Sequence, residues 1–168
     1  MKGFRWFALI GLSWLLISSE EDKGPDFVLP VDTTKVKRAI EAPSYTNRRR
    51  YFVGTLREGW QNPRLEFVIP VGEQVAAIGS GRVLKSEYSR SYGKHVIVQH
   101  NDSTTSTYAH LSELLVQAGQ GVNKGQLIGL VGNTGLSSAP HLTLYISIND
   151  KLVKPCSLLP CEQLAVCE

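Results

Sequence analysis

The chain has 168 residues, of which 42% are apolar and 20% are charged, the composition of an ordinary globular domain with extensions. Its formal net charge of +3 falls to +1 when the charges of Lys2 and Arg5 in the N-terminal segment are set aside. A balance so close to neutral excludes nucleic acid as the expected partner.

Residues 1–19 have the pattern of a targeting segment. Lys2 and Arg5 precede an apolar run over residues 6–17, and the small residues Ser18 and Ser19 follow it. The run is shorter than the roughly 20 residues that a membrane-spanning helix needs. The pattern predicts either a cleaved signal peptide or an uncleaved inner-membrane anchor formed by residues 6–17. In both cases the rest of the chain is expected to be exported to the periplasm or cell envelope.

Residues 20–60 form the expected spacer, because they are polar and contain three prolines and the basic run 48–50. Within this stretch Val36 and Ile40 lie four positions apart, which predicts a short helix around residues 33–41. A domain is expected over residues 61–160.

The C-terminal residues, 161–168, are expected to form a cysteine-containing tail. The chain's three cysteines are Cys156, Cys161 and Cys167, so at most one internal disulfide forms and one thiol remains. Which two cysteines pair stays open. Their spacing lacks a C-x2-C pair, so a metal cluster is not expected.

Beyond residue 65, short apolar runs alternate with glycines. These runs predict strands over residues 75–78, 81–84, 95–98, 104–108, 127–131 and 142–148, and a short helix or turn over 111–116. Regularly spaced short strands with glycine turns indicate an all-β antiparallel fold. Residues alternate between the two faces of the last strand. The apolar set expected to face the core is Leu142, Leu144, Ile146 and Ile148. The set expected on the opposite face is His141, Thr143, Tyr145 and Ser147.

Several motifs follow one another in a recognisable order. They are residues 70–75 (PVGEQV), 81–83 (GRV), 92–100 (YGKHVIVQH), 108–111 (YAHL), 119–129 (GQGVNKGQLIG), 131–135 (VGNTG), 140–142 (PHL) and 154–155 (KP). In this order the span from residue 62 to 155 resembles the lysostaphin/LytM-type zinc endopeptidases, peptidase family M23. The resemblance implies a compact antiparallel β-sheet or β-sandwich, related to the barrel-sandwich hybrids, with a groove across it.

The resemblance also implies where zinc would bind. The family holds zinc through an H-x3-D motif and through the second histidine of an H-x-H motif, and two further histidines assist catalysis. The assisting positions are His110 and His141 here, whereas the ligand positions hold Asn62, Glu66 and Thr143. Neutral amide and hydroxyl oxygens suit hard cations rather than zinc. A degenerate member without zinc, without another cofactor and without peptidase activity is therefore expected.

The leading hypothesis is a non-catalytic binding, regulatory or scaffold module of the cell envelope. Its expected partner is an envelope protein, such as a cell-wall hydrolase, or a peptidoglycan peptide. The expected groove residues are Glu66, Tyr108, His110, His141, Thr143 and Tyr145. His100 is expected to make a local hydrogen bond at the groove edge, and His95 to lie on the surface.

Three other readings remain. The chain could be an active zinc metalloendopeptidase that cleaves peptidoglycan peptide cross-links. Glu66, His110 and His141 could hold a displaced metal as a set of two histidines and one glutamate. Residues 121–129 also look like a strand motif of biotinyl or lipoyl carrier domains, but the flanking pattern of the modified lysine is absent.

Overall fold

The structure is a computed structural model that describes residues 26–42, 63–164 and 166–167. The expected targeting segment and Asn62 lie outside these residues. Of the described helices, none has the length and apolar character of a membrane span. The described elements are η1 (Thr33–Lys35), β1 (Arg38–Ala42), β2 (Arg64–Val68), β3 (Gln74–Ala76), β4 (Gly81–Ser89), β5 (Gly93–Gln99), β6 (Thr104–Leu114), β7 (Gly121–Val122), β8 (Leu127–Val131), β9 (Leu142–Ile148), β10 (Lys151–Val153), η2 (Pro155–Ser157), η3 (Cys161–Gln163) and β11 (Val166–Cys167).

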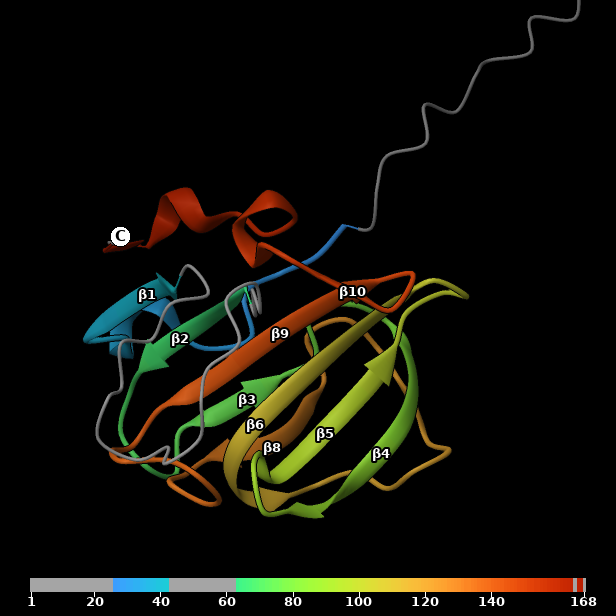
Figure 1. The fold of residues 1–168 in the computed structure, drawn as a ribbon, viewed down its shortest axis with the longest axis horizontal. Helices are drawn as coiled ribbons and strands as arrows, with labels where there is room; N and C mark the ends of the chain where they lie inside the picture. Colours follow the sequence, from blue (N-terminus) through green and yellow to red (C-terminus); the bar gives the residue numbers. More distant parts are fainter. Residues whose placement is uncertain (1–25, 43–62, 165, 168) are drawn as a thin grey trace, which may run out of the picture.

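The strands form one folded-over sheet with the order β11-β1-β2-β9-β6-β5-β4-β7. Neighbouring strands are antiparallel, apart from the parallel pair β1 and β11. The long strand β6 pairs with β5 and β9 over most of its length and with β8 near its end. The β3–β8 pair thereby forms a second layer behind β9 and β6 (Figure 1). The predicted all-β antiparallel fold is confirmed.

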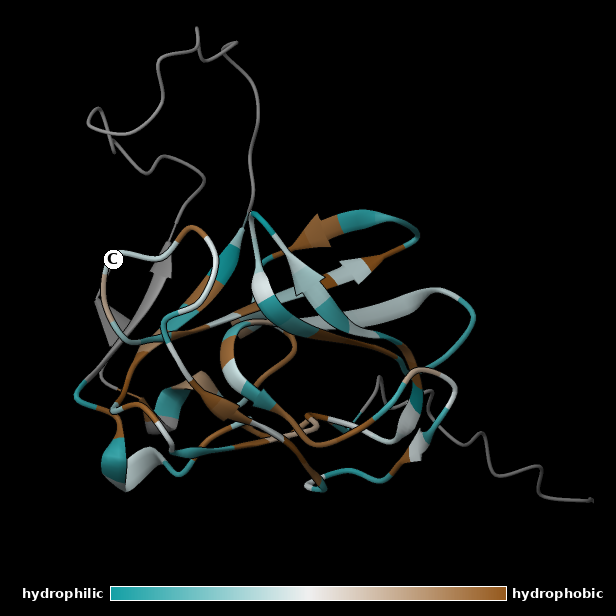
Figure 2. Cartoon of the chain, turned by 90° about the horizontal axis from the view of Figure 1, so that it is seen from below, coloured by the Kyte–Doolittle hydropathy of each residue, from teal (hydrophilic) through white to brown (hydrophobic). Residues whose placement is uncertain are grey.

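The core lies between these layers and follows from the two-residue period of the strands. On β9, Leu142, Leu144 and Ile146 are fully buried, as their alternation predicts, while Ile148 is half-buried. Figure 2 shows the resulting succession of apolar and polar stretches along the strands. Each buried aliphatic side chain contributes about 1.5–3 kcal/mol through removal from water. The largest core side chains are Tyr108, Phe67, Leu65, Ile69, Ile78 and Leu111.

Two local predictions are wrong. The expected helix over residues 33–41 is limited to the short η1, and β1 occupies residues 38–42. The expected helix or turn over 111–116 is instead mostly the end of β6, which runs to Leu114. In both places the backbone pairs with a strand distant in sequence, β2 for β1 and β8 for β6, and this pairing overrides the local pattern.

Part of the expected spacer packs against the sheet. Phe27 and Val31 belong to the hydrophobic core. The backbone N–H of Val28 donates to the carbonyl of Ile78 at 2.8 Å, and the N–H of Ala76 donates to the carbonyl of Pro30 at 2.7 Å. Residues 26–31 are therefore fastened to the β3 region by both apolar burial and backbone hydrogen bonds.

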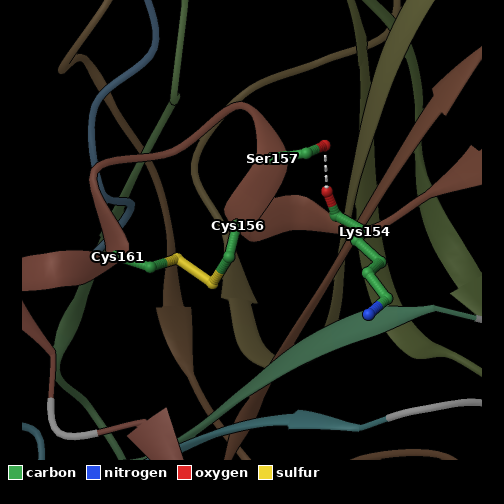
Figure 3. Close-up of a disulfide and its surroundings, with 4 residues drawn as sticks. All are labelled: Lys154, Cys156, Ser157 and Cys161. Atoms are coloured by element: carbon green, nitrogen blue, oxygen red, sulfur yellow. Dashed lines mark hydrogen bonds between the residues drawn. A yellow bond between two sulfur atoms is a disulfide. The ribbon is translucent and has the colours of Figure 1, made fainter.

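The C-terminal segment is cross-linked near the sheet. Cys156 and Cys161 form a disulfide, which resolves the pairing that the sequence left open (Figure 3). The hydroxyl of Ser157 donates to the carbonyl of Lys154 at 2.7 Å within the same turn. Cys167 lies in β11 and is paired in register with Ile40 of β1.

Candidate functional site

The candidate site lies where β2, β9 and β6 run side by side (Figure 1). Glu66 of β2 lies opposite Thr143 of β9, and Thr143 lies opposite Ala109 of β6. Directly opposed residues have Cβ atoms about 4.5–5.5 Å apart. The same register places Arg64 beside Tyr145, because Leu65 pairs with Leu144. We refer to Arg64, Glu66, His110, His141, Thr143 and Tyr145 as the candidate site.

The structure brings the two motif histidines together. The ring centroids of His110 and His141 are 4.7 Å apart with an interplanar angle of 47°. Both residues are more than nine-tenths buried. His141 immediately precedes β9 and forms an isolated antiparallel bridge with Gly132, and His110 lies within β6. The paired rings thus sit at the border between β9 and β6.

Backbone geometry directs the His110 ring toward this border. His110 has a φ of 67°, the left-handed conformation that a residue with a side chain seldom adopts. Its N–H donates to the carbonyl of Tyr92 at 2.7 Å, and the β5–β6 register shifts between Lys94 and Val96. A shift of this kind re-aims side chains that strict alternation would place elsewhere.

Each histidine is oriented through its Nδ1 atom. Nδ1 of His110 lies 2.8 Å from the carbonyl oxygen of Thr134, and Nδ1 of His141 lies 2.7 Å from that of Ala139. The hydroxyl of Ser137 is also 3.1 Å from Nδ1 of His141. A carbonyl oxygen only accepts, so both Nδ1 atoms bear the hydrogen, and in the neutral rings Nε2 is the basic nitrogen.

The loop that supplies the His110 acceptor is held rigidly. The Thr134 hydroxyl donates to the carbonyl of Leu111 at 2.7 Å and accepts from the N–H of Lys94 at 2.9 Å. Gly93 and Gly135 both have positive φ and pack against each other so closely that an added Cβ on either would overlap the neighbouring backbone. The glycines of these motifs therefore permit the contact that fixes the His110 ring.

An ion pair occupies the first part of the site. Nε of Arg64 donates to Oε1 of Glu66 at 2.8 Å, and the two side chains are 11% and 16% exposed. Arg64 lies outside the motifs that single out the other members of the site. The available signal was the presence of opposite charges two positions apart on a strand, which share a face. The carboxylate at this ligand position already has a fixed cation beside it.

Thr143 is the other notable member of the site. It is 1% exposed, and its hydroxyl Oγ1 has no hydrogen-bond partner among the described residues. Leaving a buried hydroxyl unpaired costs about 1–3 kcal/mol. Most buried polar groups in native proteins are paired, so the unpaired Thr143 hydroxyl is an unusual feature of this site.

Tyr145 contributes a phenol at the edge of the site. Burial raises its pKa to about 12, and nearby Arg64 opposes that rise. The phenol therefore remains protonated at neutral pH and can donate a hydrogen bond. The Tyr145 ring meets that of Tyr92 edge-on at a centroid distance of 5.5 Å, and Tyr92 is partly exposed.

These residues do not fit a catalytic zinc ion. Within the described ranges, Glu66, His110 and His141 do not form a group of three that could hold a metal. The Thr143 hydroxyl is a weak zinc ligand, and a metal at Glu66 would meet the positive charge of Arg64. Asn62, the remaining ligand position, lies outside the described residues.

Two predicted placements are wrong. Tyr108, expected in the groove, is fully buried in the core, where its hydroxyl accepts from the N–H of Ile78 at 2.8 Å. In a regular strand Tyr108 would share a face with His110, two residues later. The positive φ of His110 interrupts this alternation, so the two side chains lie on different faces. His95, expected on the surface, is 3% exposed, and its Nδ1 contacts the Gly93 carbonyl at 3.0 Å.

His100 makes the hydrogen bonds that were predicted, but its predicted place at the groove edge is wrong. Its Nδ1 lies 2.9 Å from the carbonyl of Ser80, and its Nε2 lies 2.8 Å from the hydroxyl of Ser106. Burial lowers the pKa of His100. These bonds lie on the core face of β6 with Tyr108, so His100 is separate from the candidate site.

Comparison with solved structures places this architecture among bacterial metallopeptidases. A zinc-containing peptidase from Vibrio cholerae superposes with a TM-score of 0.64 and 29% identity, over 76% of this chain and 38% of that one. A model of peptidase family M23 matches residues 61–155. The chain belongs to peptidase family M23.

The curated relatives are likewise named as metalloproteases or peptidoglycan endopeptidases. An uncharacterized metalloprotease of Haemophilus influenzae is 37% identical over 117 residues, which cover 69% of this chain and 24% of the relative. The peptidoglycan DD-endopeptidase ShyA of Vibrio cholerae is 42% identical over 88 residues, covering 52% of this chain and 20% of ShyA. The chain thus matches about a quarter or less of the length of these relatives.

Proposed function

We propose that this M23 domain binds a peptide of peptidoglycan without cleaving it. One observation supports the proposal above all others. At the two described positions where the family places zinc ligands, Glu66 is paired with Arg64 and Thr143 has only a buried hydroxyl. The donor set therefore suits hydrogen bonding to a ligand better than coordination of zinc.

Hydrolysis of a peptide bond in this family depends on what zinc supplies. Zinc lowers the pKa of a bound water and polarises the scissile carbonyl. Nε2 of His110 and Nε2 of His141 can accept a proton, but a general base without an activated nucleophile gives little rate enhancement. A domain that retains the histidines and lacks the zinc ligands is expected to bind and not to turn over.

The class of ligand follows from the relatives. ShyA is named a peptidoglycan DD-endopeptidase, and a 36%-identical relative from Neisseria meningitidis is named a DD-carboxypeptidase/endopeptidase. Peptide substrates of such enzymes present carbonyl and carboxylate oxygens. The candidate site offers matching donors at Arg64, Thr143 and Tyr145, together with a partly exposed aromatic ring at Tyr92.

The proposal includes a location. The charged and apolar pattern of residues 1–19 supports export to the periplasm or cell envelope, with residues 6–17 as an anchor if the segment is not cleaved. Peptidoglycan lies in that compartment. A cell-wall hydrolase or another envelope protein is the second class of partner, and it becomes an outcome of the test below.

Purified peptidoglycan sacculi test the proposal. The protein is expected to sediment with sacculi and to release no soluble peptide fragments, with or without added zinc. Tyr145→Ala is expected to weaken sedimentation, whereas Tyr88→Ala, which changes an exposed tyrosine on β4, is expected to leave it unchanged.

Two results would overturn the proposal. Zinc-dependent release of fragments that is abolished by a chelator and by His141→Ala would show an active endopeptidase. Absence of both sedimentation and release would exclude peptidoglycan as the ligand and direct attention to a protein partner.

A further inference from the structure

We propose that the candidate site recognises the free terminal carboxylate of its peptide ligand, with Arg64 as the principal donor and Thr143 and Tyr145 as supporting donors. This inference rests on the proposed function, because it specifies which part of the peptide enters the site. Arg64 would stand where the family places a metal, as a fixed positive charge.

The guanidinium of Arg64 has capacity for a second carboxylate. It presents five N–H donors, and among the described residues its hydrogen bond uses Nε alone. The Arg64 side chain is 11% exposed, so its remaining donors have little access to water. The planar guanidinium has donors on more than one edge, so it can bind a second carboxylate beside the first. Glu66 would be the first of these, and the ligand would provide the second.

Thr143 independently points to a ligand acceptor. Its buried hydroxyl has no partner among the described residues, although it lies opposite Glu66 in the β2–β9 register. A hydroxyl that donates to a ligand oxygen would satisfy this group. A carboxylate is well suited, because it accepts up to about four hydrogen bonds from donors in different directions.

Tyr145 adds a third donor on the same face of β9 as Thr143. Arg64 lies opposite Tyr145 in the β2–β9 register, and the Tyr92 ring meets the Tyr145 ring at a centroid distance of 5.5 Å. The register therefore places Arg64, Thr143 and Tyr145 on one face of the sheet, with Thr143 two residues before Tyr145 along β9.

The chemistry of these donors favours a carboxylate over other ligands. A guanidinium cannot accept a hydrogen bond, and it repels a cationic ligand. An amidated terminus presents one carbonyl oxygen and no charge, so it would satisfy fewer donors. Hydrogen bonds to a charged acceptor are worth about 1.5–3 kcal/mol, against about 1 kcal/mol for neutral pairs.

Calorimetry with matched peptides tests the inference. The probe is a synthetic peptidoglycan stem tetrapeptide that ends in D-alanine, prepared as the free acid and as the carboxamide. The free acid is expected to bind about tenfold more tightly or better. Arg64→Gln is expected to reduce this preference to below about twofold, and Thr143→Val to weaken binding of the acid several-fold. Arg82→Gln is the matched control, because Arg82 lies on β4 and hydrogen-bonds the carbonyl of Gly119.

The outcomes separate this inference from the proposed function. Equal binding of acid and carboxamide would overturn the carboxylate site and leave peptide binding intact. No binding of either form would overturn both. If Arg64→Gln does not fold, as judged by circular dichroism, Thr143→Val decides, because unchanged affinity for the acid in that variant would contradict the assigned site.

Discussion

Two buried polar networks with histidines lie on opposite faces of the same strand, β6. On the core face, His100, Ser106 and Tyr108 form a chain in which each group has a partner, ending at the N–H of Ile78 and the carbonyl of Ser80. On the other face, the candidate site contains the Thr143 hydroxyl, which has no partner among the described residues.

The difference separates polar groups that are paired within the fold from polar groups that remain unpaired. A closed hydrogen-bond chain stabilises the fold, since loss of one member leaves its neighbours unpaired in a medium of low dielectric constant. An open site costs stability until a ligand completes it. The single histidine of the core network, His100, therefore stabilises the fold, whereas we propose that the donors of the candidate site bind a ligand.

Alkaline pH gives the largest expected effect, and it acts on Tyr108 of the closed network in addition to Tyr145. Burial raises the pKa of Tyr108 to about 12, against 10.0 for an exposed tyrosine. The folded protein keeps this proton where the unfolded chain loses it, so the contribution is fully present below pH 10. It is lost as the pH rises through 10 toward 12, by about 3 kcal/mol.

Urea denaturation between pH 8 and pH 11 measures the first half of that loss, about 1.4 kcal/mol. The decrease in the free energy of unfolding is expected to be shallower in Tyr108→Phe than in wild type, because the titrating group is removed. Tyr88→Phe, an exposed control, is expected to follow wild type. An unchanged slope in Tyr108→Phe would contradict the assignment.

The next effect compares two tyrosines at neutral pH. Tyr108→Phe leaves the buried N–H of Ile78 without its acceptor, which is expected to lower the free energy of unfolding by about 2 kcal/mol. Tyr145→Phe is expected to change it by less than about 0.5 kcal/mol, since its phenol serves a ligand rather than the fold. Equal destabilisation by both variants in chemical denaturation would remove the distinction between the networks.

The smallest expected effect is an increase in the free energy of unfolding. Thr143→Val replaces an unpaired buried hydroxyl by a methyl group of similar size, so the free energy of unfolding is expected to rise by about 1 kcal/mol. Ser106→Ala, which removes a paired hydroxyl from the closed network, is expected to destabilise. A destabilised Thr143→Val in thermal or urea denaturation would show that the hydroxyl has a structural partner.

The sequence predicted the strands whose signal is local. The limits of β8 and β9 match the predicted runs, because alternation and glycine turns define them without reference to distant residues. Strand β1 and the end of β6 could not be predicted in this way, since their pairing partners lie far along the chain. Local spacing at Val36 and Ile40 favoured a helix that these partners exclude.

The candidate site was predicted where motifs specify it and missed where pairing specifies it. His110 and His141 were singled out because they lie in the motifs 108–111 and 140–142. Arg64 belongs to no motif, and its role depends on the β2–β9 register that places it beside Tyr145. Tyr108 was misassigned because the backbone of His110 departs from regular alternation.

Titration of the metal-free protein with zinc by calorimetry tests the central claim most directly. No binding is expected in the micromolar range at neutral pH, because Arg64 neutralises Glu66 and Thr143 supplies no nitrogen ligand. Stoichiometric binding of one zinc ion with micromolar or tighter affinity, lost in His110→Ala and His141→Ala, would contradict it.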